Sequence, residues 1–201
     1  MSRRPSRRLT PADVPDVRAY ERDREMVRAA VIGLKAVRRV RVAPMLSVVF
    51  ENRETVLFQV QEMARAERIT SDAGIQAELD AYESLVPGPG EWKATLFLEL
   101  RGPQEAAHWL PRLVGIEHSL VMQLADGTRV RARPVPSHAR QLSRNDVTSA
   151  VHFVEWSLTD REIAAFGPGS VLLCDHPELV ADVPLTPETC AELAMDLSGN
   201  G

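Results

Sequence analysis

The front half of the chain spaces its apolar residues as helices do, except at one pair of short runs. Apolar positions recur three and four residues apart over residues 21–38, 52–68 and 72–85, which is typical of amphipathic helices. Residues 39–42 and 46–50 are short runs rich in valine, and they favour strands. The pattern therefore predicts three helices in this half, with two strands between the first and the second.

Capping residues mark the starts of helices, including one near the N-terminus that precedes the three above. Thr10 precedes a proline and opens a helix near the N-terminus, and Asn52 is a good cap for the helix that follows it. Thr159 and Glu162 have the spacing of a capping box, which predicts a helix that ends near Phe166. Another start is expected at 143–146.

After residue 90 the pattern alternates more often and predicts strands. Residues 94–100 place alanine and leucine on one face and threonine, phenylalanine and glutamate on the other. Further strands are expected over 151–158 and 171–174, and a last helix over 186–198. Residues 87–90, Pro-Gly-Pro-Gly, cannot lie inside a helix and predict a turn.

A hairpin is expected over residues 118–133, and its register follows from its apolar residues. A two-residue turn at Asp126-Gly127 would set leucine and methionine against arginine. A three-residue turn with Gly127 in the left-handed region lets apolar positions meet. The pairs expected from this turn are Leu124 with Thr128, Met122 with Val130 and Leu120 with Ala132.

Together these elements predict an α+β fold. N-terminal helices pack on a mainly antiparallel sheet, followed by the hairpin at 118–133 and a C-terminal helix. Residues 1–8 are expected to be a disordered lead, and residues 9–201 a single α+β domain. The turn at 87–90 is the one place where that domain would divide.

Composition narrows the class of protein. The chain of 201 residues is 44% apolar and 26% charged, as globular proteins are, and no apolar run approaches the length of a membrane span. Residues 1–50 carry 12 basic against 5 acidic residues, within a net charge of −4. That asymmetry favours attraction within the fold or solvated charge, with an anion-binding arm as the alternative. Two cysteines are too few for a disulfide framework, so we expect a cytoplasmic protein.

The densest polar cluster lies where the second predicted strand meets the next helix. Helix N-termini favour anions, and on a helical wheel one phenylalanine falls on the polar face, which indicates that this face is covered. The predicted ligand- or partner-binding residues are Glu51, Asn52, Arg53, Glu54, Phe58, Gln61, Glu62 and Arg65. The alternative is a capped helix with intrahelical ion pairs that packs through Phe58.

Other chemistry has weaker signals. His118, Cys174 and His176 are candidate metal ligands, although no known zinc or di-iron spacing is present. Nucleophile and phosphate-loop motifs are absent from the sequence, which argues against an enzyme. Arg129, Arg131 and Arg133 line one strand face, but no aromatic residue is interleaved, which argues against nucleic-acid binding.

One long segment resembles a known family. The run from Phe50 to Met63, Phe-Glu-Asn-Arg-Glu-Thr-Val-Leu-Phe-Gln-Val-Gln-Glu-Met, is similar to the signature of the bacterial domain of unknown function 3501. Residues 19–22, 85–91, 94–97 and 113–117 support the resemblance. The family has no assigned activity or catalytic residues. The genes of its members are expected to lie beside those of rubrerythrin-like and iron–sulfur proteins in bacterial genomes, so the resemblance implies a protein partner in a redox or peroxide-response system.

The leading hypothesis is a cytoplasmic accessory protein that binds a partner protein or small ligand around residues 51–65. One alternative is a metal-binding redox protein or enzyme that uses carboxylate and histidine ligands. A second alternative is a nucleic-acid binder that uses its arginine-rich faces. No role in a membrane is expected, and the distance between Cys174 and Cys190 is left open.

Overall fold

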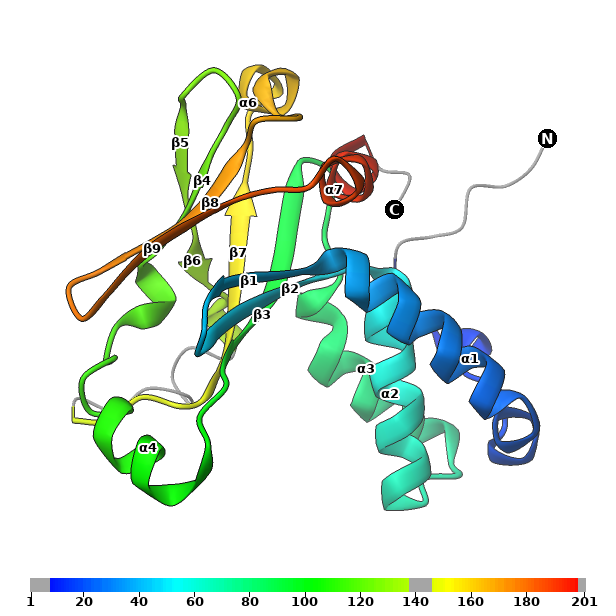
Figure 1. The fold of residues 1–201 in the computed structure, drawn as a ribbon. Helices are drawn as coiled ribbons and strands as arrows, with labels where there is room; N and C mark the ends of the chain where they lie inside the picture. The colour runs from blue at the N-terminus through cyan, green and yellow to red at the C-terminus, as the bar shows by residue number, and fades with distance from the viewer. Residues whose placement is uncertain (1–7, 138–145, 199–201) are drawn as a thin grey trace.

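Two antiparallel sheets and a set of N-terminal helices make up the computed structural model, which describes residues 8–137 and 146–198 (Figure 1). The first sheet has the order β1-β2-β3-β7-β6, with β1 Arg39–Ala43, β2 Leu46–Glu51, β3 Glu91–Leu98, β7 Val151–Ser157 and β6 Arg133–Pro134. The second has the order β5-β4-β8-β9, with β5 Arg129–Arg131, β4 Leu120–Gln123, β8 Val171–His176 and β9 Leu179–Pro184.

Most of the helices gather on one side of the fold, whereas α4 and α6 lie apart from them at the bottom and the top of Figure 1. In Figure 1, α1, α2 and α3 lie together at one end of the first sheet, and α7 lies beside them. The longer helices are α1 Val17–Arg38, α2 Arg53–Glu67, α3 Asp72–Tyr82, α4 Gly102–Trp109, α6 Asp160–Ala165 and α7 Pro187–Ser198. The single 3₁₀ turns are η1 Pro11–Asp13, η2 Glu83–Leu85 and η3 Ile116–His118.

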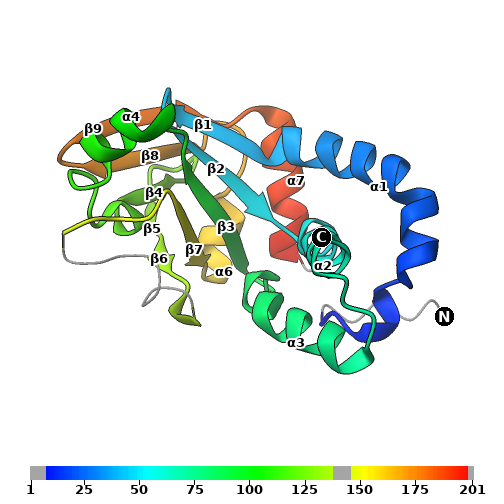
Figure 2. The same cartoon turned by 90° about the horizontal axis from the view of Figure 1, so that it is seen from below.

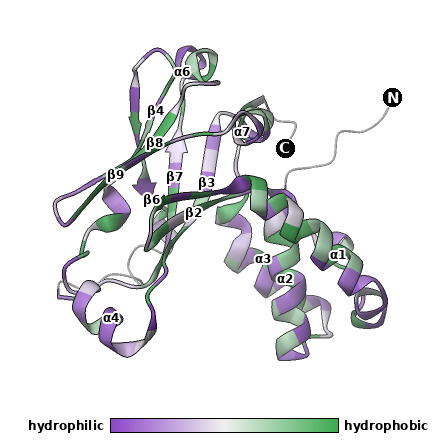
Figure 3. Cartoon of the chain, viewed as in Figure 1, coloured by the Kyte–Doolittle hydropathy of each residue, from purple (hydrophilic) through white to green (hydrophobic). Residues whose placement is uncertain are grey.

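The hydrophobic core has two parts. The larger part lies between the sheets and α7, where the buried rings of Trp92 and Trp156 both contact the ring of Phe50. The smaller part joins α2 to α3 through residues such as Val60 and Leu79. Figure 3 shows that α1, α2 and α3 carry hydrophilic and hydrophobic residues in turn, as amphipathic helices do.

The predicted α+β fold, with N-terminal helices, antiparallel strands and a C-terminal helix, is confirmed. The hairpin has the three-residue turn: Met122 pairs with Val130, and the Leu124 N–H donates to the Thr128 carbonyl at 2.8 Å. Gly127 has a φ of 87°, the left-handed value that the turn requires.

Several elements differ from the sequence prediction. The helix expected to open at Thr10 is the single 3₁₀ turn η1, and the strand expected over 94–100 is β3, Glu91–Leu98. The helix expected over 21–38 begins at Val17, because the Asp16 side chain accepts hydrogen bonds from the N–H groups of Arg18 and Ala19 at 2.9 and 3.0 Å. The strand expected over 171–174 continues to His176 and turns back into a ninth strand, β9. That strand was missed although Pro177 marks its turn, because it is a half-buried edge strand that contains Asp182 and Pro184.

Some predictions fall on parts of the chain that the structure does not describe. Residues 1–7 of the expected lead and Ser143 of the expected helix start lie outside the described residues. Arg8, the first described residue, forms an ion pair with Glu83 at 2.8 Å.

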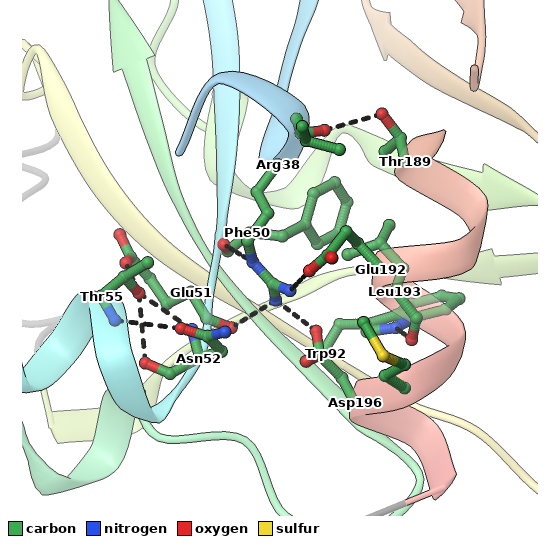
Figure 4. Close-up of polar contacts among 12 residues, drawn as sticks. Arg38, Phe50, Glu51, Asn52, Thr55, Trp92, Thr189, Glu192, Leu193 and Asp196 are labelled. Atoms are coloured by element: carbon green, nitrogen blue, oxygen red, sulfur yellow. Dashed lines mark hydrogen bonds and ion pairs between the residues drawn. The ribbon is translucent and has the colours of Figure 1, made fainter. Parts of the chain in front are cut away.

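One buried arginine joins the helices to the sheet (Figure 4). Arg38, the last residue of α1, is fully buried and donates from Nε to the Phe50 carbonyl at 2.9 Å and from Nη2 to the Glu51 carbonyl at 3.1 Å. The same guanidinium is paired with Asp196 and, at 3.2 Å, with Glu192, both on α7. It therefore fixes the end of α1, the end of β2 and the C-terminal helix to one another.

Further bonds hold α7 to the first sheet. The Trp92 indole N–H donates to the Leu193 carbonyl at 3.0 Å, and the Gly90 N–H donates to the Leu197 carbonyl at 3.2 Å. The predicted turn at 87–90 is therefore tied to the C-terminal helix.

We expect Arg38→Met to destabilise the fold by about 3–5 kcal/mol, because the carboxylate of Asp196 would stay buried without its charge partner. The double variant Arg38→Met/Asp196→Leu should recover much of that loss, since it removes both charges. Urea unfolding measures both effects. Arg41→Met, which breaks an exposed ion pair with Glu99, is the control and should cost less than about 1 kcal/mol. Equal losses in the single and double variants would contradict the prediction.

Candidate ligand-binding pocket

The first predicted site residues, Glu51 and Asn52, form the cap of α2. The buried carboxylate of Glu51 accepts hydrogen bonds from the hydroxyls of Thr55 at 2.5 Å and Thr95 at 2.7 Å. The Asn52 side chain accepts from the Thr55 N–H at 3.0 Å, as the sequence predicted for an N-cap. Both oxygens of Glu51 are thus engaged inside the protein, and these residues hold the helix in place.

The next three predicted residues have different surroundings. Arg53 forms an ion pair with Asp13 at 2.5 Å and thereby attaches η1 to the start of α2. Burial opposes this pairing, but hydrogen bonds from Thr10 and Arg53 outweigh it and lower the pKa of Asp13. Glu54 is exposed and Phe58 is half-buried.

A polar cluster joins α2 to α1 at Glu62. Its carboxylate accepts from the Tyr20 hydroxyl at 2.6 Å and from Nε and Nη2 of Arg24 at 2.8 and 2.9 Å. Arg65 lies 3.5 Å from the same carboxylate. The bonds from Arg24, assisted by the Tyr20 hydroxyl and opposed by burial, lower the pKa of Glu62 to about 2. Burial and the bond to Glu62 in turn raise the pKa of Tyr20.

Beside this cluster is a pocket of about 500 Å³. Its walls come from residues within the ranges 11–20, 61–65 and 69–75, which belong to η1, the first turn of α1, the last half of α2 and the start of α3. Figure 2 shows these helices from below, with η1 joining the start of α1 to the side of α3. A volume of this size is within the range of small-molecule sites.

The end of α2 shapes one wall of the pocket. Arg68 adopts a left-handed conformation, with φ of 57°, and terminates the helix. The Ile69 N–H then donates to the Ala64 carbonyl at 2.8 Å, which turns the chain back so that Ile69 and Thr70 line the cavity.

Two predicted residues present unused polar groups to this pocket. Gln61 is only 8% exposed, and within the described part of the chain its side-chain amide makes no hydrogen bond. Arg65 also lines the pocket, and its buried Nε has no hydrogen-bond partner among the described residues. A buried donor without a partner, such as the Nε–H of Arg65, costs about 1–3 kcal/mol, so this arrangement is unusual for a wall that stays empty.

The candidate metal ligands are not arranged as a site. Nδ1 of His176 accepts from the Glu178 N–H at 3.2 Å, so Nε2 is the donor to the Val114 carbonyl at 3.1 Å. Cys174 lies in the core, where burial raises the pKa of its thiol, and His118 is exposed. Over residues 8–137 and 146–198, no three His, Cys, Asp or Glu side chains could together hold a metal ion.

The arginine stripe is confirmed as exposed but is partly neutralised. Arg131 is bidentate on Asp175, at 2.9 and 2.5 Å, and this lowers the pKa of that carboxyl. Arg129 donates to Gln123 at 3.1 Å, and Arg133 is exposed.

Sequence reasoning missed the part of the pocket that α2 does not supply. Val14, which follows η1, Tyr20 from α1 and Ile75 from α3 line it. Tyr20 carried a signal, because the segment 19–22 was among those that support the family resemblance. The two aliphatic residues carried none, since a pocket wall and a helix contact look alike in sequence.

These features define the class: an α+β protein of two antiparallel sheets, with a pocket enclosed by its N-terminal helices. The chain belongs to the family described as protein of unknown function (DUF3501), whose model matches residues 8–197. The resemblance inferred from the sequence is therefore confirmed.

A solved structure supports the assignment. The chain is 36% identical to a novel protein of unknown function from Burkholderia pseudomallei, with a TM-score of 0.85 over 94% of this chain and 99% of that chain. Comparison with curated proteins finds no match. None of the described helices combines the length and the apolar character that crossing a bilayer needs.

We expect the Glu62 cluster to give the protein an acid-sensitive component of stability. Because folding lowers the pKa of Glu62 from 4.5 to about 2, its contribution is complete above pH 4.5 and is lost as the pH falls through that interval. Glu62→Gln should therefore be less stable than wild type at neutral pH, and the gap should narrow in acid. Urea unfolding from pH 7 to about pH 2 measures it, with exposed Glu54→Gln as the control. A gap that is constant with pH would contradict the prediction.

We expect Gln61→Met to leave the free energy of unfolding within about 0.5 kcal/mol of wild type, because the amide makes no hydrogen bond to the described residues and methionine has a similar shape. Thermal or urea unfolding without added ligand measures the change. Gln59→Met is the matched control, since Gln59 is on the same helix but not on the pocket wall. Destabilisation by Gln61→Met alone would show that the amide is satisfied in the folded protein.

Proposed function

We propose that this protein binds a small molecule in the pocket between η1, α1, α2 and α3, and acts as a binding or accessory protein. The observation that carries the proposal is Arg65, whose Nε is buried on the pocket wall without a hydrogen-bond partner among the described residues, beside Gln61, whose side-chain amide makes no hydrogen bond to them either. Proteins retain polar groups that lower the stability of the folded state where those groups serve a function.

The composition of the pocket supports the same proposal. Ligand sites are mostly apolar, with a few polar groups that fix orientation. Here the apolar walls include Pro15, Val17 and Ile69, and the polar groups that face the cavity include Gln61 and Arg65. The walls are also held together by ion pairs and hydrogen bonds, so the cavity is formed before a ligand enters.

The proposed site includes fewer of the residues that were predicted from the sequence. The proposal keeps Gln61 and Arg65, and it adds Tyr20 from α1. Glu51, Asn52 and Arg53 support the helix that carries them.

The cellular context is part of the proposal. Both cysteines are free thiols, which supports a reducing cytoplasm. A protein partner in a redox system is proposed from the resemblance alone. Ligand binding in the pocket would then change the affinity for that partner.

A thermal-shift screen of small metabolites tests the function. We expect at least one compound to raise the unfolding midpoint by about 5–10 °C at a hundredfold excess over Kd. Thr70→Trp, which places a large side chain on the exposed rim of the pocket, should abolish that shift.

Ala66→Trp is the matched control, because Ala66 is exposed but lies off the pocket wall, and it should respond as wild type does. A screen without a stabilising compound contradicts the proposal. So does a shift that survives Thr70→Trp.

A further inference from the structure

We propose that the pocket recognises an uncharged carboxamide or lactam group carried on an apolar ring, through Gln61 and Arg65. The inference rests on the proposed function and names the class of ligand. It follows from three properties of the pocket: its unused hydrogen-bonding groups, its charge and its walls.

The unused groups are both donors and acceptors. Gln61 and Arg65 are four residues apart on α2, so their side chains lie next to each other on one face. Arg65 offers one Nε–H, and the Gln61 amide offers two N–H groups and one carbonyl oxygen. A carboxamide or lactam presents a carbonyl oxygen beside an N–H, so it can accept from Arg65 and donate to Gln61 at once.

Other head groups leave part of this set unsatisfied. A ketone or ester can accept but has no N–H for the Gln61 carbonyl. An ionised carboxylate also only accepts, and it would place a charge against that carbonyl oxygen. Each buried group left without a partner lowers the affinity, so the pair selects a head group with both functions.

The charge of the pocket favours a neutral ligand. The charged lining residues are Asp16, Asp72, Arg18 and Arg65, two of each sign. The guanidinium of Arg65 is already 3.5 Å from Glu62 and 3.7 Å from Glu21. An anion would therefore lose its hydration without meeting an uncompensated positive charge.

The remaining walls indicate an apolar body for the ligand. Val14, Pro15, Val17, Ile69 and Ile75 line the cavity with aliphatic carbon. A volume of about 500 Å³ accommodates a ring with substituents. The proposed ligands are therefore small aromatic or alicyclic carboxamides and lactams.

Three probes of similar shape separate the head groups: benzamide, benzoate and acetophenone. In titrations of the isotopically labelled protein followed by NMR at pH 7, we expect benzamide to bind about tenfold more tightly than either of the others. Gln61→Met should weaken benzamide binding about tenfold and leave acetophenone binding nearly unchanged. Gln59→Met should bind all three as wild type does.

Benzoate binding as tight as benzamide, or benzamide binding that is insensitive to Gln61→Met, would overturn the inference. The absence of binding by benzamide would overturn it too. In each of these cases the thermal-shift screen decides the proposed function separately. A hit of other chemistry that Thr70→Trp abolishes leaves the function standing and the ligand class wrong, whereas a screen without a hit removes both.

Discussion

The structure depends on the burial of one guanidinium, that of Arg38. An arginine out of water must satisfy its donors internally, and here the carbonyls of Phe50 and Glu51 and the carboxylate of Asp196 do so. Because these acceptors lie at the end of β2 and on α7, the chain can bury Arg38 only if both elements are in place. The next residue after β2, Asn52, caps α2, so the position of that helix follows from the same constraint.

The pocket follows from the spacing between α1 and α2 away from the sheet. Near the sheet they converge at Arg38, whereas two turns along α2 the contact between them is polar, from Tyr20 and Arg24 to Glu62. Long side chains that meet through hydrogen bonds keep the helices apart, and the ion pair of Arg53 with Asp13 brings η1 to the gap from the other side. A cavity between polar contacts is therefore built into the spacing of the helices.

The parts of this arrangement that were predictable are those set by neighbours in sequence. The Asn52 cap and the hairpin pairing of Met122 with Val130 follow from local chemistry and from the period of the apolar residues, and both were predicted. β9 was not, because it is a half-buried edge strand that contains Asp182 and Pro184. The polar segment around α2 was identified, but sequence alone could not separate Glu51, which accepts a hydrogen bond from Thr95 on another strand, from Gln61, whose side chain makes no hydrogen bond within residues 8–137 and 146–198. That distinction depends on contacts between distant segments.

An unsatisfied buried group indicates a ligand only when there is space beside it. The indole N–H of Trp156 also lacks a partner among the described residues, but it lies in the close-packed core near Phe50, and no pocket residue adjoins it in sequence. Its cost is a consequence of packing a large aromatic between two sheets. Gln61 differs because its amide faces a cavity that can hold a molecule, and because Arg65 offers a second unused donor on the same face. Two adjacent polar groups without protein partners at an open cavity are rare in a packed core but ordinary in a binding site. For this reason we assign the function to the helical pocket rather than to the sheets.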